Sequence, residues 1–272
     1  MNAYTEITDR VLNMLSSGII PWIQPYVGSH GARNLLSQKE YSLCNQMLLP
    51  QGGEYLTPKQ ALDLGGKFAG EKTSRVYFCS QVKKKVGDDE DGNPIYTEYP
   101  CYKAYNVLHL SQVEGVESRM ETTTKTKSPI EEAEELAMAY LKKANLTIRA
   151  LPYGSPSIVG NTINIPSAGM YNSIEAYYCD LFRQIVKSTA KELNRHGEGE
   201  KWDYASREEL VGEIGAAVIC NDQEIDILDV IENSTAYIAR WMGVLQNDKG
   251  ALLWASKKAK EAVEYIKAAL VA

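Results

Sequence analysis

The sequence predicts an α+β chain in which a first half containing strands precedes a mainly helical second half. Two runs rich in Val, Tyr and Phe, residues 75–82 and 95–108, flank an Asp- and Gly-rich turn. Such a pattern is typical of a β-hairpin. Apolar residues recur at helical spacing through most of the second half, and that spacing predicts helices.

The first half begins with an amphipathic helix over 5–17, because its apolar residues fall on one face. Gly18 ends this helix and Pro21 prevents its return. Thr57 and Pro58 predict a short helix, since a capping residue is followed by Pro at the first helical position. The hairpin described above completes this half.

The second half follows a polar stretch without periodicity, residues 117–128, which we interpret as a linker between domains 1–116 and 129–272. Ser128 to Glu131 forms a capping box with Pro at the first helical position. A second hairpin is expected around Gly160-Asn161. Further helices are predicted over 173–194, from Ser206 onward, over 234–247 and over 249–270.

Composition limits the possible functions. The chain has 272 residues, a formal net charge of −6 and 24% charged residues, which is ordinary for a soluble globular protein. No apolar run is long enough to span a bilayer, and the N-terminus lacks the apolar core of a secretory signal. We therefore expect a cytoplasmic protein without a membrane partner.

Cysteine and histidine usage excludes several kinds of site. Five scattered Cys form no C-x-x-C pair, which disfavours a disulfide scaffold and a Cys-rich zinc site. The three histidines, His30, His109 and His196, are far apart in the sequence. No two of them can lie one helical turn apart, so a mechanism built on a helical His pair is excluded.

The predicted helix over 173–194 has one apolar stripe. Asp180, Arg183, Gln184, Lys187 and Lys191 fall on the other face. This face is either solvated or the wall of a cleft, and the pattern alone favours the solvated face.

At this helix the chain resembles a known family. The run from Tyr177 to Thr189, continued by Leu193-Asn194-Arg195, resembles the zincin helix of ArdC-type antirestriction proteins, which plasmids, phages and conjugative elements carry. Residues 204–217 resemble the helix that bears the family's third zinc ligand. Residues 236–241 and 246–249 resemble its C-terminal helices.

The first half resembles the single-stranded-DNA-binding N-terminal domain of the same family. The matching residues are Gly18 to Trp22, Arg33-Asn34-Leu35, Tyr41, Asn45, Thr57 to Gln60, Gly65-Gly66, Gly70-Glu71-Lys72 and Tyr105-Asn106-Val107. The resemblance covers nearly the whole chain in the same order. It implies a small α+β domain that binds single-stranded DNA, followed by a mainly helical zincin-like domain with a small sheet.

The zinc motif itself is altered. The family's helical H-E-x-x-H motif holds zinc with two His and activates water with Glu. Here Arg183 and Lys187 stand at the His positions, and Gln184 stands at the Glu position. A charged Arg or Lys cannot ligate zinc, and Gln cannot act as a general base. The resemblance therefore implies an inactive, zincin-like pseudoenzyme without a metal or another cofactor.

Two interpretations of Glu209 stay open. The resemblance places it at the third zinc ligand, with Glu213 one turn later as an outer-shell group, whereas its spacing from Ser206 fits a capping box. If the zincin fold is kept, Arg183 and Lys187 face Glu209 or Glu213. Ion pairs would then replace the cross-link that the metal makes between two helices.

A nucleic-acid interface needs cations for phosphates and aromatic rings for bases. Residues 1–116 carry eleven Lys and Arg against twelve Asp and Glu, whereas the rest of the chain carries eighteen against twenty-three. The first half is thus the less acidic one, although its Tyr residues could equally be core packing. The predicted phosphate contacts are Arg33, Lys39, Lys72 and Arg75, and the predicted stacking residues are Trp22 and Tyr41. The acidic turn at 88–91 is expected to lie away from the groove.

Three functions compete. The first is a non-catalytic antirestriction protein of a mobile element or phage that binds single-stranded DNA and protects it from a host defence nuclease. The second is a protein-binding inhibitor of a restriction or CRISPR nuclease, which acts through the acidic second domain without binding DNA. The third, an active hydrolase with unusual ligands, is disfavoured because no histidine falls at the expected site.

Overall fold

The computed structural model describes residues 3–23, 31–89, 91–120, 127–195, 204–227, 230 and 235–271. It confirms the predicted α+β class. The elements of the first half are α1 (Ala3–Ser16), β1 (Arg33–Asn34), α2 (Leu43–Leu48), β2 (Glu54–Leu56), α3 (Pro58–Asp63), β3 (Ser74–Asp88), β4 (Pro94–His109) and the short 3₁₀ helix η1 (Leu110–Gln112).

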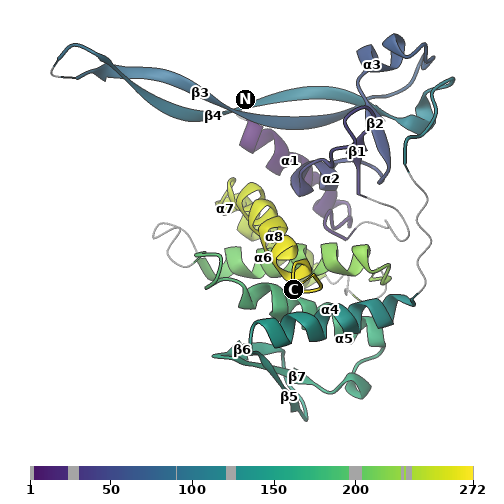
Figure 1. Cartoon of the computed structure of the whole chain (residues 1–272), viewed down its shortest axis with the longest axis vertical. Coiled ribbons are helices and arrows are strands. Elements are labelled where there is room, and N and C mark those ends of the chain that lie inside the picture. The colour runs from purple at the N-terminus through teal and green to yellow at the C-terminus, as the bar shows by residue number, and fades with distance from the viewer. Residues whose placement is uncertain are drawn as a thin grey trace.

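A four-stranded sheet in the order β1-β2-β4-β3 organises the first half. Its two long strands form the predicted hairpin, which runs well beyond the rest of the sheet and ends at the acidic turn (Figure 1). The sequence did not predict β1, α2 or β2. These elements are too short to show a period, and their positions depend on pairing and packing with the hairpin.

The second half contains α4 (Pro129–Lys143), β5 (Thr147–Leu151), β6 (Ser157–Val159), β7 (Thr162–Pro166), the 3₁₀ helix η2 (Ala168–Met170), α5 (Ile174–Ser188), α6 (Tyr204–Asp222), α7 (Thr235–Asn247) and α8 (Ala251–Lys267). The capping box of Ser128 and Glu131 is present at the start of α4. Gly160, with a φ of 57°, turns the predicted β6–β7 hairpin. Strand β5, which was not predicted, pairs with β7 in parallel.

Two helix boundaries differ from the prediction. Helix α5 ends at Ser188 rather than at residue 194, and the segment after it returns toward α6. There the buried Arg195 pairs with Glu208 at 2.9 Å and donates to the carbonyl of Val186 at 3.1 Å. Helix α6 begins at Tyr204, so Ser206 lies inside its first turn and is not the capping residue.

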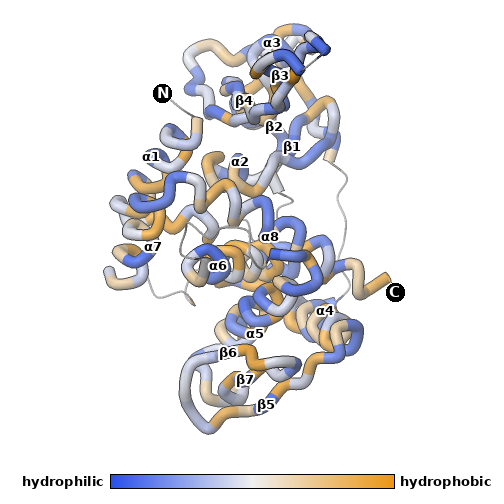
Figure 2. The backbone as a smooth tube through the Cα atoms, turned by 90° about the vertical axis from the view of Figure 1, so that its left-hand side faces the viewer, coloured by the Kyte–Doolittle hydropathy of each residue, from blue (hydrophilic) through white to orange (hydrophobic). Residues whose placement is uncertain are grey.

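The two sheets lie at opposite ends of the molecule with helices between them (Figure 2). Helix α1 packs beside α7, and α2 packs beside α8. One hydrophobic cluster therefore joins residues of α1 and α2, including Val11 and Met47, to the core of the helical half, including Phe182 and Ile214. The division into domains 1–116 and 129–272 stays a prediction, whereas the packing between the two halves is continuous.

Part of the predicted linker is attached to the first half. The buried carboxylate of Glu54 accepts hydrogen bonds from Ser118 Oγ at 2.7 Å, the Arg119 backbone N–H at 3.0 Å and Gln38 Nε2 at 2.6 Å. The following residues 121–126 lie outside the described part of the chain. No described helix has the length and apolar character that crossing a membrane requires.

Candidate functional site

Helices α5 and α6 carry the positions that resemble the zinc motif, and two glycines of α6 let the helices approach closely. A Cβ atom at Gly212 would lie 3.1 Å from Lys187 Cγ and 3.2 Å from Arg183 Cγ. A Cβ at Gly215 would lie 2.7 Å from Val186 Cγ1. The side chains of Arg183 and Lys187 therefore pass directly across the backbone of α6.

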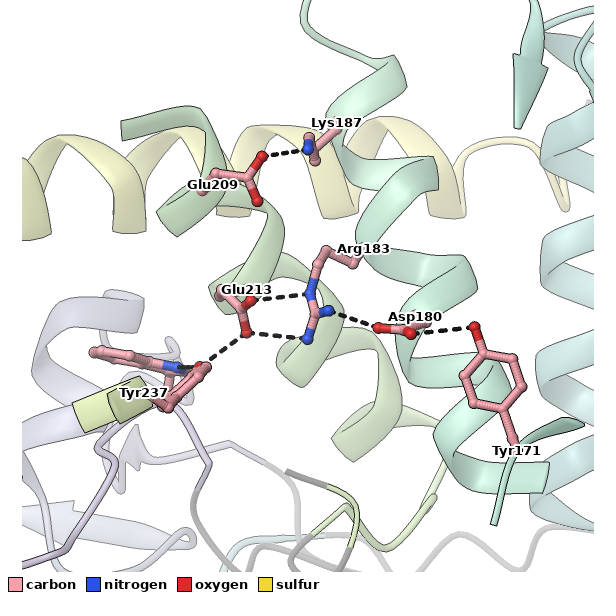
Figure 3. Close-up of polar contacts among 8 residues, drawn as sticks. Tyr171, Asp180, Arg183, Lys187, Glu209, Glu213 and Tyr237 are labelled. Atoms are coloured by element: carbon pink, nitrogen blue, oxygen red, sulfur yellow. Dashed lines mark hydrogen bonds and ion pairs between the residues drawn. The ribbon is translucent and has the colours of Figure 1, made fainter. Parts of the chain in front are cut away.

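Arg183 is the centre of an ion-pair network (Figure 3). Its Nε lies 3.0 Å from Glu213 Oε1, and one Nη donates to Glu213 Oε2 at 3.2 Å. The other Nη donates to Asp180 Oδ1 at 2.6 Å. Both edges of the guanidinium thus face carboxylates, although on the Glu213 side only the Nη group is aligned for a hydrogen bond and Nε is close without being aligned.

The electrostatics of this network depend on burial. Burial lowers the pKa of Arg183, but the neighbouring negative groups, Glu213 first among them and Asp180 as well, together raise it more, so the net shift is upward. Burial raises the pKa of Glu213, and the charge of Arg183 opposes that shift. The ionised state of Glu213 therefore relies on its arginine partner.

Lys187 forms an ion pair with Glu209 one turn away from the Arg183 network. Both ion pairs expected between the two helices are therefore present. Glu209 faces Lys187 and not a helix end, which removes the capping-box interpretation. Arg183, Lys187, Glu209 and Glu213 lie together as the zincin resemblance implies (Figure 3).

Tyrosines extend the network at both ends. Tyr171 donates to Asp180 Oδ2 at 3.1 Å, and Tyr237 of α7 donates to Glu213 Oε2 at 2.9 Å. The indole N–H of Trp22 donates to the Tyr237 oxygen at 3.2 Å. A residue of the first half thus contacts one end of this network.

This contact corrects the prediction for Trp22 as a stacking residue. Its side chain is only 4% exposed and packs edge-on against Trp241, with the ring centroids 6.0 Å apart. A ring enclosed in this way cannot offer a face to a base. Nothing in the sequence pattern indicated the contact, because Tyr237 and Trp241 follow more than two hundred residues later.

Gln184 also differs from its prediction. The sequence placed it on the polar face of the helix, but its side chain is buried, and its Oε1 has no hydrogen-bond partner among the described residues. A helical pattern cannot show this burial, because it depends on which distant segments pack against α5.

These residues do not fit a zinc ion. Two cations project to the place where the family has histidines, and their partner carboxylates are already engaged. Within the described ranges, no three His, Cys, Asp or Glu residues gather in a metal-binding group. A cleft of about 880 Å³ still opens beside the network and is lined by Tyr171, Arg183, Glu213 and Arg240, among others. The network therefore lies in the wall of a cleft.

A second candidate site is a groove of about 570 Å³ on the sheet of the first half. It is lined by Asn34, Ser37, Lys39, Glu40, Tyr41, Thr57, Gln60, Phe78, Tyr105 and Val107. Phe78 and Tyr105 are 49% and 44% exposed, and their rings meet edge to face at 5.5 Å. Lys39 is exposed, and among the described residues no carboxylate forms an ion pair with it. The groove thus combines a free cation with open aromatic faces.

The structure brings two of the six predicted nucleic-acid residues to this groove. Lys39 lines it with its charge available, whereas Tyr41 lines it with a ring that is only 4% exposed and packs against Phe78. Tyr41 is therefore a support for the exposed ring and offers no free face of its own.

The other predicted cations lie elsewhere. Arg33 pairs with Glu40 at 3.3 Å and is mostly covered, and Arg75 pairs with Glu6 of α1 at 2.6 Å on the opposite face of the sheet. Lys72 is exposed before β3 and does not line the groove. The prediction missed Phe78, which the alternation of β3 could have placed on the same face as Val76 and away from Tyr77.

Comparisons with known proteins agree with this architecture. A family model described as the N-terminal domain of anti-restriction factor ArdC matches residues 1–108, and one described as a zincin-like metallopeptidase matches residues 131–258. The protein y4eC of Sinorhizobium fredii is 24% identical over 290 residues, which cover 97% of this chain and 91% of that protein.

Two solved structures share the fold along the whole chain. The metal-free crystal structure of the antirestriction protein ArdC from plasmid R388 has a TM-score of 0.77 at 22% identity, covering 100% of this chain and 98% of that one. The Mn(II)-bound structure of that protein has a TM-score of 0.72 at 21% identity, covering 99% and 98%.

Proposed function

Because the chain is an ArdC-type protein, in which an ArdC N-terminal domain precedes a zincin-like metallopeptidase domain, we propose that it is a non-catalytic antirestriction protein of a mobile element or phage. In this proposal the first half binds single-stranded DNA and shields it from a host defence nuclease. The helical half acts as a scaffold whose metal site has become an ion-pair network.

The groove on the first half is the observation that carries the DNA-binding part of the proposal. Single-stranded nucleic acids are bound by a cation near the backbone together with rings on which bases stack. Lys39 supplies the cation, and Phe78 and Tyr105 supply exposed ring faces beside it.

The absence of catalysis is supported by the chemistry of α5. A zincin reaction needs a metal-bound water and a carboxylate base. Here Arg183 and Lys187 repel a metal cation, and Gln184 has no proton-accepting carboxylate. Metal analysis of the purified protein tests this part, and stoichiometric, tightly bound zinc would contradict it.

Titration of labelled oligonucleotides tests the DNA-binding part. We expect a preference for single strands over duplexes and an affinity that falls with salt, since phosphate contacts release counterions. The double variant Phe78→Ala/Tyr105→Ala removes two stacking faces, each worth about 1–3 kcal/mol per base. Its affinity for single strands should drop by at least tenfold, about 1.4 kcal/mol.

A pair of charge-reversal variants separates a DNA contact at the groove from a general effect of net charge on DNA binding. Lys39→Glu should weaken binding, whereas Lys142→Glu, an equal charge change at the exposed end of α4, should leave it nearly unchanged. Failure of the wild-type protein to bind single strands near physiological salt would overturn the proposal. That result would favour an inhibitor that contacts the nuclease directly through the acidic second half.

A further inference from the structure

The β3–β4 hairpin extends far beyond the groove. We call its projecting part, residues 78–103, the arm. In Figure 1 the arm leaves the sheet and passes over α1 toward the acidic turn, with no other element beside its outer part. Apart from Glu90 and Pro100, whose side chains are not described, its side chains are exposed or half-exposed along this length. A two-stranded ribbon that packs against nothing else is only marginally stable in water, so the length of the arm adds little to the stability of the fold.

The register of the two strands sorts the arm into two faces, because directly paired residues point to the same side. The groove face continues the side that carries Tyr105. It pairs Phe78 with Lys103, Ser80 with Cys101, Val82 with Tyr99 and Lys84 with Thr97. The rear face pairs Cys79 with Tyr102, Lys83 with Glu98 and Lys85 with Tyr96.

The two faces differ in charge. The lysines of the rear face have acidic partners, since Lys83 lies 3.7 Å from Glu98 and Lys85 lies 2.6 Å from Asp88. The groove face carries Lys84 and Lys103 and no carboxylate at all. Neither of these two lysines forms an ion pair within the described part of the chain. The groove face is therefore a strip of unneutralised positive charge.

The aromatic residues nearest the sheet differ in the same way, whereas farther out the rear face also exposes a ring, that of Tyr96. On the rear face, Tyr102 is covered by Tyr4 of α1, with ring centroids 5.1 Å apart. On the groove face, Tyr99 is 47% exposed and follows the exposed Phe78 and Tyr105 along the strand pair. Rings and free lysines thus alternate outward from the groove, in the combination that recognises single strands.

We propose that single-stranded DNA continues from the groove along the groove face of the arm as far as Lys84. The strip from Tyr105 to Thr97 measures about 27 Å, at about 3.4 Å per residue of an antiparallel strand. Tyr99 stacks on a base, and Lys103 and Lys84 contact phosphates on either side of it. Beyond Lys84, the carboxylates of Asp88 and Asp89 repel the phosphate chain and set the end of the site.

This inference rests on the proposed DNA binding and adds the arm as a second contact region. A matched pair of double variants tests it. Lys84→Gln/Tyr99→Ala alters the groove face, and Lys83→Gln/Tyr96→Ala alters the rear face. Each pair removes one positive charge and one exposed ring, since Tyr96 is 56% exposed. Any long-range effect of net charge is therefore the same in both variants.

Oligonucleotide length separates the arm from the groove. We use single strands of about 5 and about 20 nucleotides, which bracket the site sizes of compact single-strand-binding folds. The groove-face variant should bind the long strand on the order of tenfold more weakly than wild type, with a shallower salt dependence. It should bind the short strand like wild type. The rear-face variant should bind both strands like wild type.

Each alternative result has a distinct meaning. Equal binding of the long strand by both arm variants, with binding still lost in Phe78→Ala/Tyr105→Ala, would overturn the arm inference and leave the proposed function intact. A wild-type protein that binds neither strand would overturn both. A wild-type dimer that Tyr99→Ala dissociates without DNA would assign the face to a second copy of the chain and also overturn the inference.

Discussion

Two cations of α5, Arg183 and Lys187, each pair with a carboxylate of α6, and the consequence for stability is local. Arg183 reaches Glu213, and Lys187 reaches Glu209. The two pairs are not equivalent, because Glu213 is buried whereas Glu209 is about one-third exposed. Removing the partner of a buried charge costs far more than breaking an exposed pair.

Arg183→Ala should therefore lower the free energy of unfolding by about 3–5 kcal/mol, since it leaves Glu213 without its partner. Lys187→Ala should cost clearly less, and Lys191→Ala, at an exposed position without a described ion pair, should change little. Urea unfolding followed by circular dichroism measures all three variants. No loss of stability in Arg183→Ala would contradict the structural role of the network.

Glu54 makes the stability of the protein depend on pH in the acid range. Burial raises the pKa of Glu54, but hydrogen bonds from Ser118, Gln38 and the Arg119 backbone lower it more, so the net shift is downward. A carboxyl whose folded pKa is depressed stabilises the protein above its ordinary pKa of about 4.5. That stabilisation is lost as the pH falls below this value and through the folded pKa.

Glu54→Gln should accordingly flatten the pH dependence. We expect the stability of the wild type to exceed that of the variant by about 1–3 kcal/mol at pH 7, and the difference to shrink below about pH 4.5. Thermal melts across pH 3–7 measure the two curves. A difference that is independent of pH would contradict the ionised state of Glu54.

Among the elements, the ion-pair network depends on the close approach of α5 and α6. Gly215 faces the branched side chain of Val186, which is fully buried and cannot move aside. Gly243 of α7, in contrast, has no atom within 4 Å of the place where a Cβ would lie. The two helical glycines therefore differ in environment.

Gly215→Ala should destabilise the protein by about 1–3 kcal/mol, because an added methyl group overpacks the helix interface. Gly243→Ala should stabilise it by about 0.4–1 kcal/mol, because alanine favours the helix and restricts the unfolded chain. The midpoints of thermal unfolding should move in opposite directions. A similar shift for both would mean that α5 and α6 are not in the close contact described.

For the whole molecule, the shared core predicts one cooperative unit. Residues of α1 and α2 pack into the same cluster as α5, α6 and α8, and Trp22 contacts both Tyr237 and Trp241. A polar segment between two halves of a sequence predicts where the chain crosses from one to the other. It does not predict that the halves unfold separately.

We therefore expect a single unfolding transition at which circular dichroism and tryptophan fluorescence coincide. Trp22→Ala should lower the stability of this single transition by about 3–5 kcal/mol, whereas Tyr153→Ala, at an exposed position, should change it by less than about 0.5 kcal/mol. Two separate transitions, of which Trp22→Ala shifts only one, would contradict a shared core.

The sequence by itself predicted the class of the fold, most of the helices and both hairpins, and the resemblance led to the expectation that Arg183 and Lys187 face Glu209 or Glu213. The helices and hairpins follow from local periodicity and from capping and turn residues. The expected ion pairs follow from a family resemblance that runs in the same order along the chain and can be compared residue by residue at the motif. The same resemblance indicated that the metal ligands had been replaced.

Only the tertiary structure decided which aromatic residues are available. Trp22 and Tyr41 read as surface rings in the sequence, yet packing against elements distant in the chain buries them. Phe78, Tyr99 and Tyr105 stay open, and the register of one strand pair turns all three to the same face of the hairpin. Exposure depends on which distant segments meet, and a local pattern contains no information about that.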